Sequence, residues 1–175
     1  MDLKATIRAI PDYPKPGIVF RDLTTLMGNP EAFQATCAAL ADAYKSQGAT
    51  HIAGIEARGF IFGAAVADRL NIAFVPIRKS GKLPAETIAK SYALEYGEDT
   101  LEVHQDAFPA GAKVLLIDDL LATGGTALAS VALVQEAGAE VVGAAFVVEL
   151  EGLPGRKLLQ DAGVEVLALT AFQED

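Results

Sequence analysis

Short apolar runs alternate with segments of helical periodicity along most of this chain. The runs predict seven strands, at residues 51–55, 73–77, 91–96, 101–104, 113–117, 141–148 and 164–169. The periodic segments predict four helices, at residues 30–47, 59–70, 126–137 and 153–162. Regular alternation of strand and helix is typical of an α/β fold.

Two of the predicted strands are apolar at consecutive positions rather than at every second one. They read VLLI (114–117) and VVGAAFVV (141–148). Strands of this kind are buried on both sides, which predicts a doubly wound, mostly parallel sheet with helices on both faces. In such sheets ligands bind beyond the carboxyl ends of the strands, where the strand order reverses. We therefore expect the functional site at that edge.

The first long helix has clear boundary signals. Asn29 suits the N-cap position, Pro30 the first helical position, and Gly48 the end. Its apolar residues recur every three or four positions: Phe33, Cys37, Leu40 and Tyr44. This spacing makes Cys37 a core residue and not a nucleophile.

Two segments lack any regular period. Prolines and glycines interrupt residues 11–30, and residues 78–90 are polar with glycine and proline, so we expect the second to be a mobile loop. No internal repeat, low-complexity tract or linker divides the chain. We expect residues 1–175 to form a single domain.

Composition excludes several classes of protein. At 51% hydrophobic residues and a mean hydropathy of +0.31, the chain is not disordered. One cysteine excludes a disulfide framework and a cysteine-based zinc site. The apolar run at 141–148 is far shorter than the ~20 residues of a spanning helix, and the N-terminus has no apolar signal core. We expect a cytoplasmic protein without a membrane partner.

Charge is unevenly distributed along the chain. The formal net charge is −9, which disfavours nucleic acid as a partner. Residues 1–92 nevertheless carry 11 basic and 8 acidic side chains, whereas residues 93–175 carry 3 basic and 15 acidic ones. The segment RKSGK (78–82) concentrates three cations, which suggests an anionic ligand nearby. His51 and His104 are isolated and are interpreted as structural.

The segment VLLIDDLLATGGTA (114–127) carries the most chemical information. An apolar strand leads into Asp118 and Asp119, and a loop with two glycines precedes a helix. Helix N-termini bind phosphate through unpaired N–H groups, and Thr123 and Thr126 add hydroxyl donors. A ribose 5-phosphate satisfies both ends, because its hydroxyls donate to carboxylates while its phosphate accepts from the loop. The same residues equally fit an acidic pair that binds Mg²⁺, as in signalling receiver domains, followed by an ordinary glycine turn.

The whole pattern resembles the motif that binds phosphoribosyl diphosphate (PRPP) in type I phosphoribosyltransferases. Five further segments resemble, in order, those of the adenine phosphoribosyltransferase family: GIVFRDLTTLMGNP (17–30), EARGFIFG (56–63), IRKSGKLP (77–84), SYALEYG (91–97) and VVELEGLPG (147–155). The resemblance implies the type I phosphoribosyltransferase fold, with residues 1–30 forming an N-terminal helix and a small base-binding hood. It also implies transfer of ribose 5-phosphate from PRPP to adenine with Mg²⁺, giving AMP and pyrophosphate, in a homodimer.

The resemblance further implies a role for each site residue. Ribose and 5′-phosphate would be bound by Asp118, Asp119, Ala122, Thr123, Gly124, Gly125 and Thr126. Pyrophosphate would be bound by Arg58, Arg78, Lys79 and Lys82. Adenine would be bound by Val19, Phe20, Arg21 and Leu150. The catalytic groups would be Glu95, Tyr96 and Arg58, with Glu95 as general base, and Mg²⁺ would be held mainly through PRPP. At Ser80 the chain departs from the family pattern, which has proline or arginine there.

Two other functions remain open on the sequence. One is a phosphoribosyltransferase for another base, such as xanthine. The other is a regulator that senses PRPP or a nucleotide without catalysis. Regulators of that kind usually carry a surface or an added domain for nucleic acid, which the acidic balance disfavours.

Overall fold

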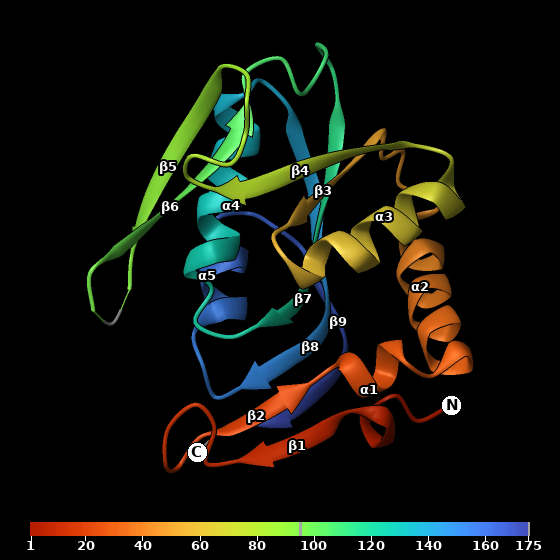
Figure 1. The fold of residues 1–175 in the computed structure, drawn as a ribbon. Helices are drawn as coiled ribbons and strands as arrows, with labels where there is room; N and C mark the ends of the chain where they lie inside the picture. The colour runs from red at the N-terminus through yellow and green to blue at the C-terminus, as the bar shows by residue number, and fades with distance from the viewer. Residues whose placement is uncertain (95, 175) are drawn as a thin grey trace.

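The computed structural model describes residues 1–94 and 96–174, and in this part of the chain it shows one large sheet and one small one (Figure 1). The large sheet has seven strands in the order β5-β6-β4-β3-β7-β8-β9. Its parallel strands are β3 (His51–Ile55), β4 (Ala73–Lys79), β7 (Lys113–Leu121), β8 (Glu140–Glu151) and β9 (Val166–Gln173). The antiparallel edge consists of β5 (Thr87–Ala93) and β6 (Glu98–His104). The predicted mostly parallel sheet is confirmed.

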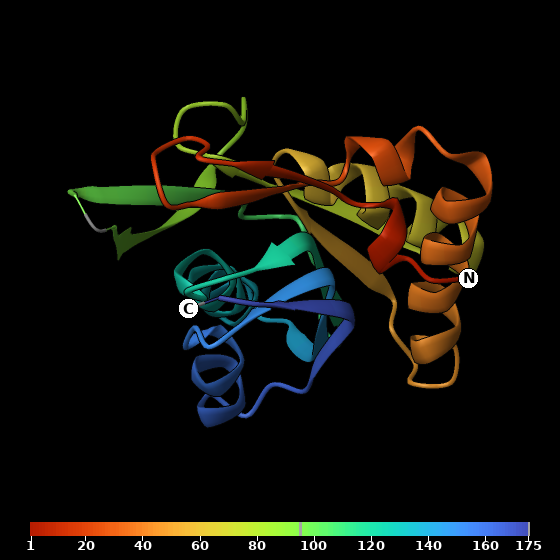
Figure 2. The ribbon, with the colours of Figure 1, turned by 90° about the horizontal axis from the view of Figure 1, so that it is seen from below.

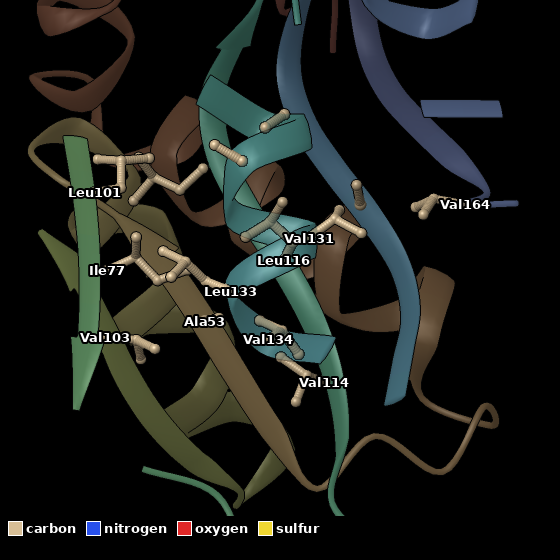
Figure 3. Close-up of a cluster of buried hydrophobic side chains, with 14 of the residues drawn as sticks. Ala53, Ile77, Leu101, Val103, Val114, Leu116, Val131, Leu133, Val134 and Val164 are labelled. Atoms are coloured by element: carbon tan, nitrogen blue, oxygen red, sulfur yellow. The ribbon is translucent and has the colours of Figure 1, made fainter. Parts of the chain in front are cut away.

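Helices cover both faces of this sheet, as the view from below shows (Figure 2). One face carries α2 (Pro30–Tyr44) and α3 (Arg58–Leu70), and the other carries α4 (Gly125–Glu136) and α5 (Gly155–Asp161). Alternate residues of a strand enter different cores. Leu115 and Ile117 of β7 are buried with α2 and α3, whereas Val114 and Leu116 are buried with α4 (Figure 3). This burial on both sides explains why the strand is continuously apolar.

The start of α2 is as predicted. The Asn29 side chain accepts hydrogen bonds from the N–H groups of Glu31 and Ala32, and Pro30 is the first helical residue. The helix ends at Tyr44, three residues before the predicted end. Cys37 is fully buried in the core that α2 shares with α3.

The N-terminal segment is more regular than its prolines and glycines indicate. It contains a 3₁₀ turn η1 (Lys4–Thr6), strands β1 (Arg8–Pro11) and β2 (Val19–Asp22), and helix α1 (Thr24–Met27). The two strands form an antiparallel hairpin. A hairpin closed by a seven-residue loop depends on pairing between distant residues, which residue periodicity does not report.

The hairpin lies beside the carboxyl end of β9 (Figure 1). The Arg21 guanidinium lies 4.1 Å and the Lys4 ammonium 4.7 Å from the centre of the Phe172 ring. Within the hairpin, Asp22 accepts hydrogen bonds from Thr24 and Arg8, and these lower its pKa to about 2. The segment predicted to form a hood thus contains the β1–β2 hairpin, in which the ionised Asp22 on β2 binds Arg8 on β1.

Two boundaries near the candidate site differ from the prediction. The segment predicted as a loop at 78–90 contributes its first two residues to β4 and its last four to β5, so that 80–86 alone lacks regular structure. Strand β5 lies at the edge of the sheet with alternate residues exposed, which explains its polar sequence. Strand β7 continues to Leu121, so Asp118 and Asp119 lie within it and not after it.

The helices of the described residues are all too short or too polar to cross a membrane.

Candidate active site

An open cavity of about 270 Å³ lies at the carboxyl ends of β3 and β7, at the edge of the sheet where the sequence predicts a site. It is lined by three parts of the chain: residues 56–58, Lys79 and residues 118–127. Nine predicted ligand-binding residues are brought together there: Arg58, Lys79, Asp118, Asp119, Ala122, Thr123, Gly124, Gly125 and Thr126.

The glycine loop between β7 and α4 is held against the start of α5. Gly124 has a φ of +89°, and a Cβ atom there would lie 2.7 Å from the Cα atom of Gly155. The Gly155 N–H donates to the Ala122 carbonyl at 3.1 Å. This close approach directs the loop and the first turn of α4 into the cavity. Unpaired N–H groups and the helix dipole make that turn suitable for a phosphate.

Asp118 and Asp119 form the carboxylate wall of the cavity. Arg58 Nε donates to Asp119 Oδ2 at 2.5 Å, and the Asp119 N–H donates to Asp118 Oδ1 at 2.8 Å. Burial, with the neighbouring charge of Asp119, raises the pKa of Asp118 well above its usual range. Gly59 is required here, because a Cβ atom on it would lie 2.8 Å from Asp118 Oδ1. A ligand that donates hydroxyl protons would stabilise the charged form of this pair.

Glu56 organises the basic side of the cavity. It accepts hydrogen bonds from the Lys79 N–H at 2.7 Å, from Lys82 Nζ at 2.5 Å and from Arg78 at 3.2 Å. Burial alone would raise the pKa of Glu56, but the bonds from Lys82, Lys79 and Arg78 outweigh it and lower the pKa to about 2. Arg78 and Lys82 thus reach the site through Glu56 and do not line the cavity themselves.

Glu56 is a site residue that the sequence did not single out, although its position carries a signal. It directly follows an apolar strand and stands two residues before Arg58. Tyr92 and Asp99 were missed as well. The Tyr92 hydroxyl accepts hydrogen bonds from Thr126 Oγ1 at 3.1 Å and Lys79 Nζ at 3.3 Å, and Lys79 forms an ion pair with Asp99. The pairing of β5 with β6 places these two residues opposite each other, which no local pattern indicates.

The predicted adenine-binding residues lie apart from the cavity wall. Val19, Phe20 and Arg21 are half-buried on β2, and Leu150 is half-buried near the carboxyl end of β8. None of the four lines the cavity. Their assignment to the base stays a prediction.

Of the predicted catalytic groups, Arg58 lines the cavity. Glu95 lies outside the described residues. Tyr96 is 80% exposed and does not line the cavity, and its ring centre lies 5.8 Å from Lys15 Nζ in the loop of the N-terminal hairpin. Ser80 is exposed, with its N–H donating to the Thr100 carbonyl at 3.1 Å.

The fold and the cavity together define a class of protein. A family model described as "Phosphoribosyl transferase domain" matches residues 23–167, which include β7, the glycine loop and α4. The chain is a type I phosphoribosyltransferase by this match and by its sheet with the hairpin.

Known relatives narrow the class further. An adenine phosphoribosyltransferase of Rhizobium leguminosarum bv. trifolii is 56% identical over 171 residues, covering 98% of this chain and 94% of the relative. The crystal structure of the Rhodothermus marinus adenine phosphoribosyltransferase is 50% identical with a TM-score of 0.91, covering 97% of this chain and 96% of its own. The Saccharomyces cerevisiae enzyme, complexed with an imino-altritol bisphosphate and adenine, is 39% identical with a TM-score of 0.90 and 96% coverage of both chains. This chain belongs to the adenine phosphoribosyltransferase family.

Proposed function

We propose that this protein transfers ribose 5-phosphate from PRPP to adenine, producing AMP and pyrophosphate for purine salvage. The observation that carries the proposal is the cavity itself. Its wall combines a glycine loop and a helix N-terminus, a carboxylate pair, and the cations Arg58 and Lys79. PRPP carries a phosphate, a ribose diol and a diphosphate, and the cavity wall has a matching group for each of them. The family membership of the chain supports adenine as the base.

In this proposal the protein recognises the 5′-phosphate with hydrogen-bond donors and the ribose hydroxyls with hydrogen-bond acceptors. Residues 122–126 donate backbone and hydroxyl hydrogen bonds to the 5′-phosphate. Asp118 and Asp119 accept hydrogen bonds from the 2′ and 3′ hydroxyls. Asp118, whose pKa is raised by burial and by the neighbouring charge of Asp119, gains hydrogen-bond donors from the diol that favour its charged form.

The cations of the cavity and of the adjoining segment would neutralise the leaving group. Arg58, which is half-exposed on α3, can turn from Asp119 towards the diphosphate. Lys79 lines the cavity, while Arg78 and Lys82 approach it through Glu56. Guanidinium and ammonium groups stabilise the negative charge that grows on the diphosphate as the C1–O bond breaks.

Adenine is proposed to bind under the N-terminal hairpin. An adjacent N–H and C=O of the backbone near Val19 and Arg21 would match the acceptor–donor edge of adenine, with Phe20 and Leu150 close by. Glu95 is proposed as the general base that accepts the purine proton when the base nitrogen attacks C1, with Tyr96 beside it. A 6-oxo purine presents the opposite edge and would leave a polar group unpaired.

Magnesium is part of the same proposal. The His, Cys, Asp and Glu side chains of residues 1–94 and 96–174 form no group of three that could hold a metal ion. The diphosphate and ribose oxygens of PRPP are the hard ligands that Mg²⁺ prefers, so the ion would be held mainly through the substrate. It would supply charge neutralisation at the leaving group.

Further parts of the proposal concern the whole protein. Residues 1–175 would act as a single domain, with residues 1–30 contributing the hood and the loop within 78–90 closing over PRPP to exclude water. A homodimer is proposed from the family resemblance, and the exposed side chain of Ile61, one turn along α3 from Arg58, offers apolar surface for it. The single, buried thiol of Cys37 agrees with a cytoplasmic location.

Product analysis tests this function directly. The purified protein is mixed with PRPP, Mg²⁺ and one of adenine, hypoxanthine or xanthine, and the nucleotide product is separated by chromatography. We expect AMP from adenine and little product from the other bases. A variant with both Asp118→Asn and Asp119→Asn serves as the control for a contaminating enzyme. Product from hypoxanthine or xanthine but not adenine would overturn the base assignment, and binding of PRPP without any product would favour a sensing protein.

A further inference from the structure

Tyr92 connects the two anion-binding sides of the cavity, although it does not line the cavity itself. Its hydroxyl accepts a hydrogen bond from Thr126 Oγ1 at 3.1 Å, in the first turn of α4. It accepts a second from Lys79 Nζ at 3.3 Å, at the end of β4. It donates its own proton to Asp99 Oδ2 at 3.4 Å. One hydroxyl thus contacts both the phosphate loop and a cation of the diphosphate side.

These three partners occupy every hydrogen-bonding position of the hydroxyl. A phenol has one donor and two acceptor positions. The Lys79 ammonium has three N–H donors, of which Asp99 and Tyr92 take two. Within residues 1–94 and 96–174 the third N–H has no hydrogen-bond partner, and it can donate to a ligand in the cavity that Lys79 lines. Tyr92 therefore helps to fix the direction of that donor.

The Tyr92 ring is held in place by its surroundings. Tyr92 and Asp99 are paired across β5 and β6, which positions the hydroxyl beside its acceptor. On the other side the ring packs on the phosphate loop, since a Cβ atom on Gly125 would lie 3.2 Å from Tyr92 Cδ2. The edge of the sheet and the start of α4 thus meet at this one side chain.

We propose that Tyr92 is a positioning residue that couples the 5′-phosphate loop to the diphosphate cations. This inference rests on the proposed function. When Thr126 Oγ1 donates its hydrogen bond to a bound phosphate instead of to Tyr92, the Tyr92 hydroxyl turns from Asp99 and donates to Thr126 Oγ1. Lys79 keeps its bond to the Tyr92 oxygen and its ion pair with Asp99. A 5′-phosphate thus meets Thr126 oriented by Tyr92, and a diphosphate meets Lys79 oriented by Tyr92 and Asp99.

The variant Tyr92→Phe removes the hydroxyl and keeps the ring against Gly125. We expect the Kd of AMP and the Kd of inorganic pyrophosphate with Mg²⁺, measured by calorimetry, each to rise about fivefold to tenfold. The KM of PRPP is expected to rise by a similar factor, while the KM of adenine stays unchanged. Unaltered Kd values for both anions would overturn the inference.

Double-mutant cycles separate positioning from a general structural effect. In a Thr126→Val background, Tyr92→Phe should change the Kd of AMP less than about twofold and still weaken pyrophosphate. In a Lys79→Met background, Tyr92→Phe should change the Kd of pyrophosphate less than about twofold and still weaken AMP binding. If Tyr92→Phe weakens both anions equally in every background, the residue supports the fold and does not act through Thr126 and Lys79.

Tyr44→Phe is the matched control. It removes the hydroxyl of a buried tyrosine on α2 that does not line the cavity, whereas Tyr92 is half-buried. Neither anion is expected to bind this variant differently from wild type. If the wild-type protein binds neither AMP nor pyrophosphate, the proposed function is overturned. If the wild type binds both and Tyr92→Phe binds them equally well, only this inference is overturned.

Discussion

Single residues in the cavity are constrained by space, charge and backbone conformation at the same time. Gly124 combines a positive φ with a backbone neighbour where its side chain would be. Asp118 is a half-buried carboxyl group that lies next to another carboxylate. Each of these features is costly in an ordinary protein position, and each is useful for holding a sugar phosphate. Changes at these residues should therefore separate binding from stability.

Gly124→Ala should weaken AMP binding at least about tenfold, because the new Cβ would lie 2.7 Å from the Gly155 Cα and the loop must move. Calorimetric titration with AMP measures the effect. Gly138→Ala is the matched control, since Gly138 has a φ of +88° and no heavy atom of the described residues lies within 4 Å of its Cβ position. The control should lose about 1 kcal/mol of stability from the strained φ and keep its affinity. Equal affinity of both variants would contradict the role of the loop.

Asp118→Asn should stabilise the protein at neutral pH while abolishing activity. The pKa of Asp118 is raised above 3.8, so the folded state retains a proton that the unfolded state has lost. The stability contributed by this group therefore falls as pH rises from 3.8 through the folded pKa. Asparagine stays neutral, so the variant should have a Tm about 2–4 °C higher at pH 8 and no advantage below pH 3.8. Thermal unfolding across this range measures the difference, and curves that run parallel at all pH values would refute the argument.

Glu95→Gln should lower kcat by about 10²-fold or more, because an amide cannot accept the purine proton. The KM of PRPP should change little. Steady-state kinetics with both substrates gives the two parameters separately. Glu98→Gln is the control, since Glu98 is an exposed glutamate at the start of β6. An unchanged kcat for Glu95→Gln would remove this residue from the mechanism.

At the scale of elements, the candidate site depends on where strands and helices end. The sequence predicted the helix start at Asn29 and the strand β3 to the residue, because capping chemistry and buried apolar runs are local signals. It misjudged the N-terminal hairpin and the segment around β5. Their residues mix polar with apolar types and are mostly exposed or half-buried, and they become strands through pairing with distant partners.

The junction of β3 and β4 is also an arrangement of elements rather than of neighbours in sequence. Glu56 at the end of β3 accepts the N–H of Lys79 on β4 and pairs with Lys82 beyond it. The Glu56 carboxylate thereby holds the segment 78–82, which carries Arg78, Lys79 and Lys82, against the end of β3. Its neutral counterpart should loosen that segment.

Glu56→Gln should lower the Tm by about 2–4 °C at pH 7 and raise the KM of PRPP. The pKa of Glu56 is lowered to about 2, so the stability it contributes is present above pH 4.5 and is lost as pH falls towards 2. The difference between wild type and variant should shrink over this window, which urea unfolding at a series of pH values would show. Glu86→Gln, at an exposed glutamate before β5, should match wild type throughout. A constant difference from pH 7 to 3 would exclude the ionised carboxylate as the cause.

At the scale of the whole molecule, the cavity joins segments that are far apart in the chain. Residues 56–58, Lys79 and residues 118–127 meet because β3, β4 and β7 are parallel neighbours whose carboxyl ends share one edge. A ligand bound there contacts several elements at once. Its binding should therefore stabilise the entire fold.

AMP at about 100 times its Kd should add about 2.7 kcal/mol to the free energy of unfolding, raising the Tm by about 5–10 °C. Differential scanning fluorimetry with increasing AMP measures the shift. Adenosine is the control, because it lacks the 5′-phosphate that the glycine loop is proposed to bind. It should shift the Tm far less. Equal shifts from both ligands would mean that the loop does not hold the phosphate.

The amino-acid sequence by itself determined the α/β class, the core strands, and the carboxylate pair and glycine loop. These are local features: a buried run, a cap, or a turn at a helix start is encoded by adjacent residues. Only the tertiary structure decided that Glu56 binds the nearby cations and that Tyr92 contacts both Lys79 and Thr126. It also decided that the backbone of Gly155 leaves no space for a side chain at Gly124. Those contacts join residues 13 to 34 positions apart. They depend on the order and direction of the strands, which neighbouring residues in the sequence do not encode.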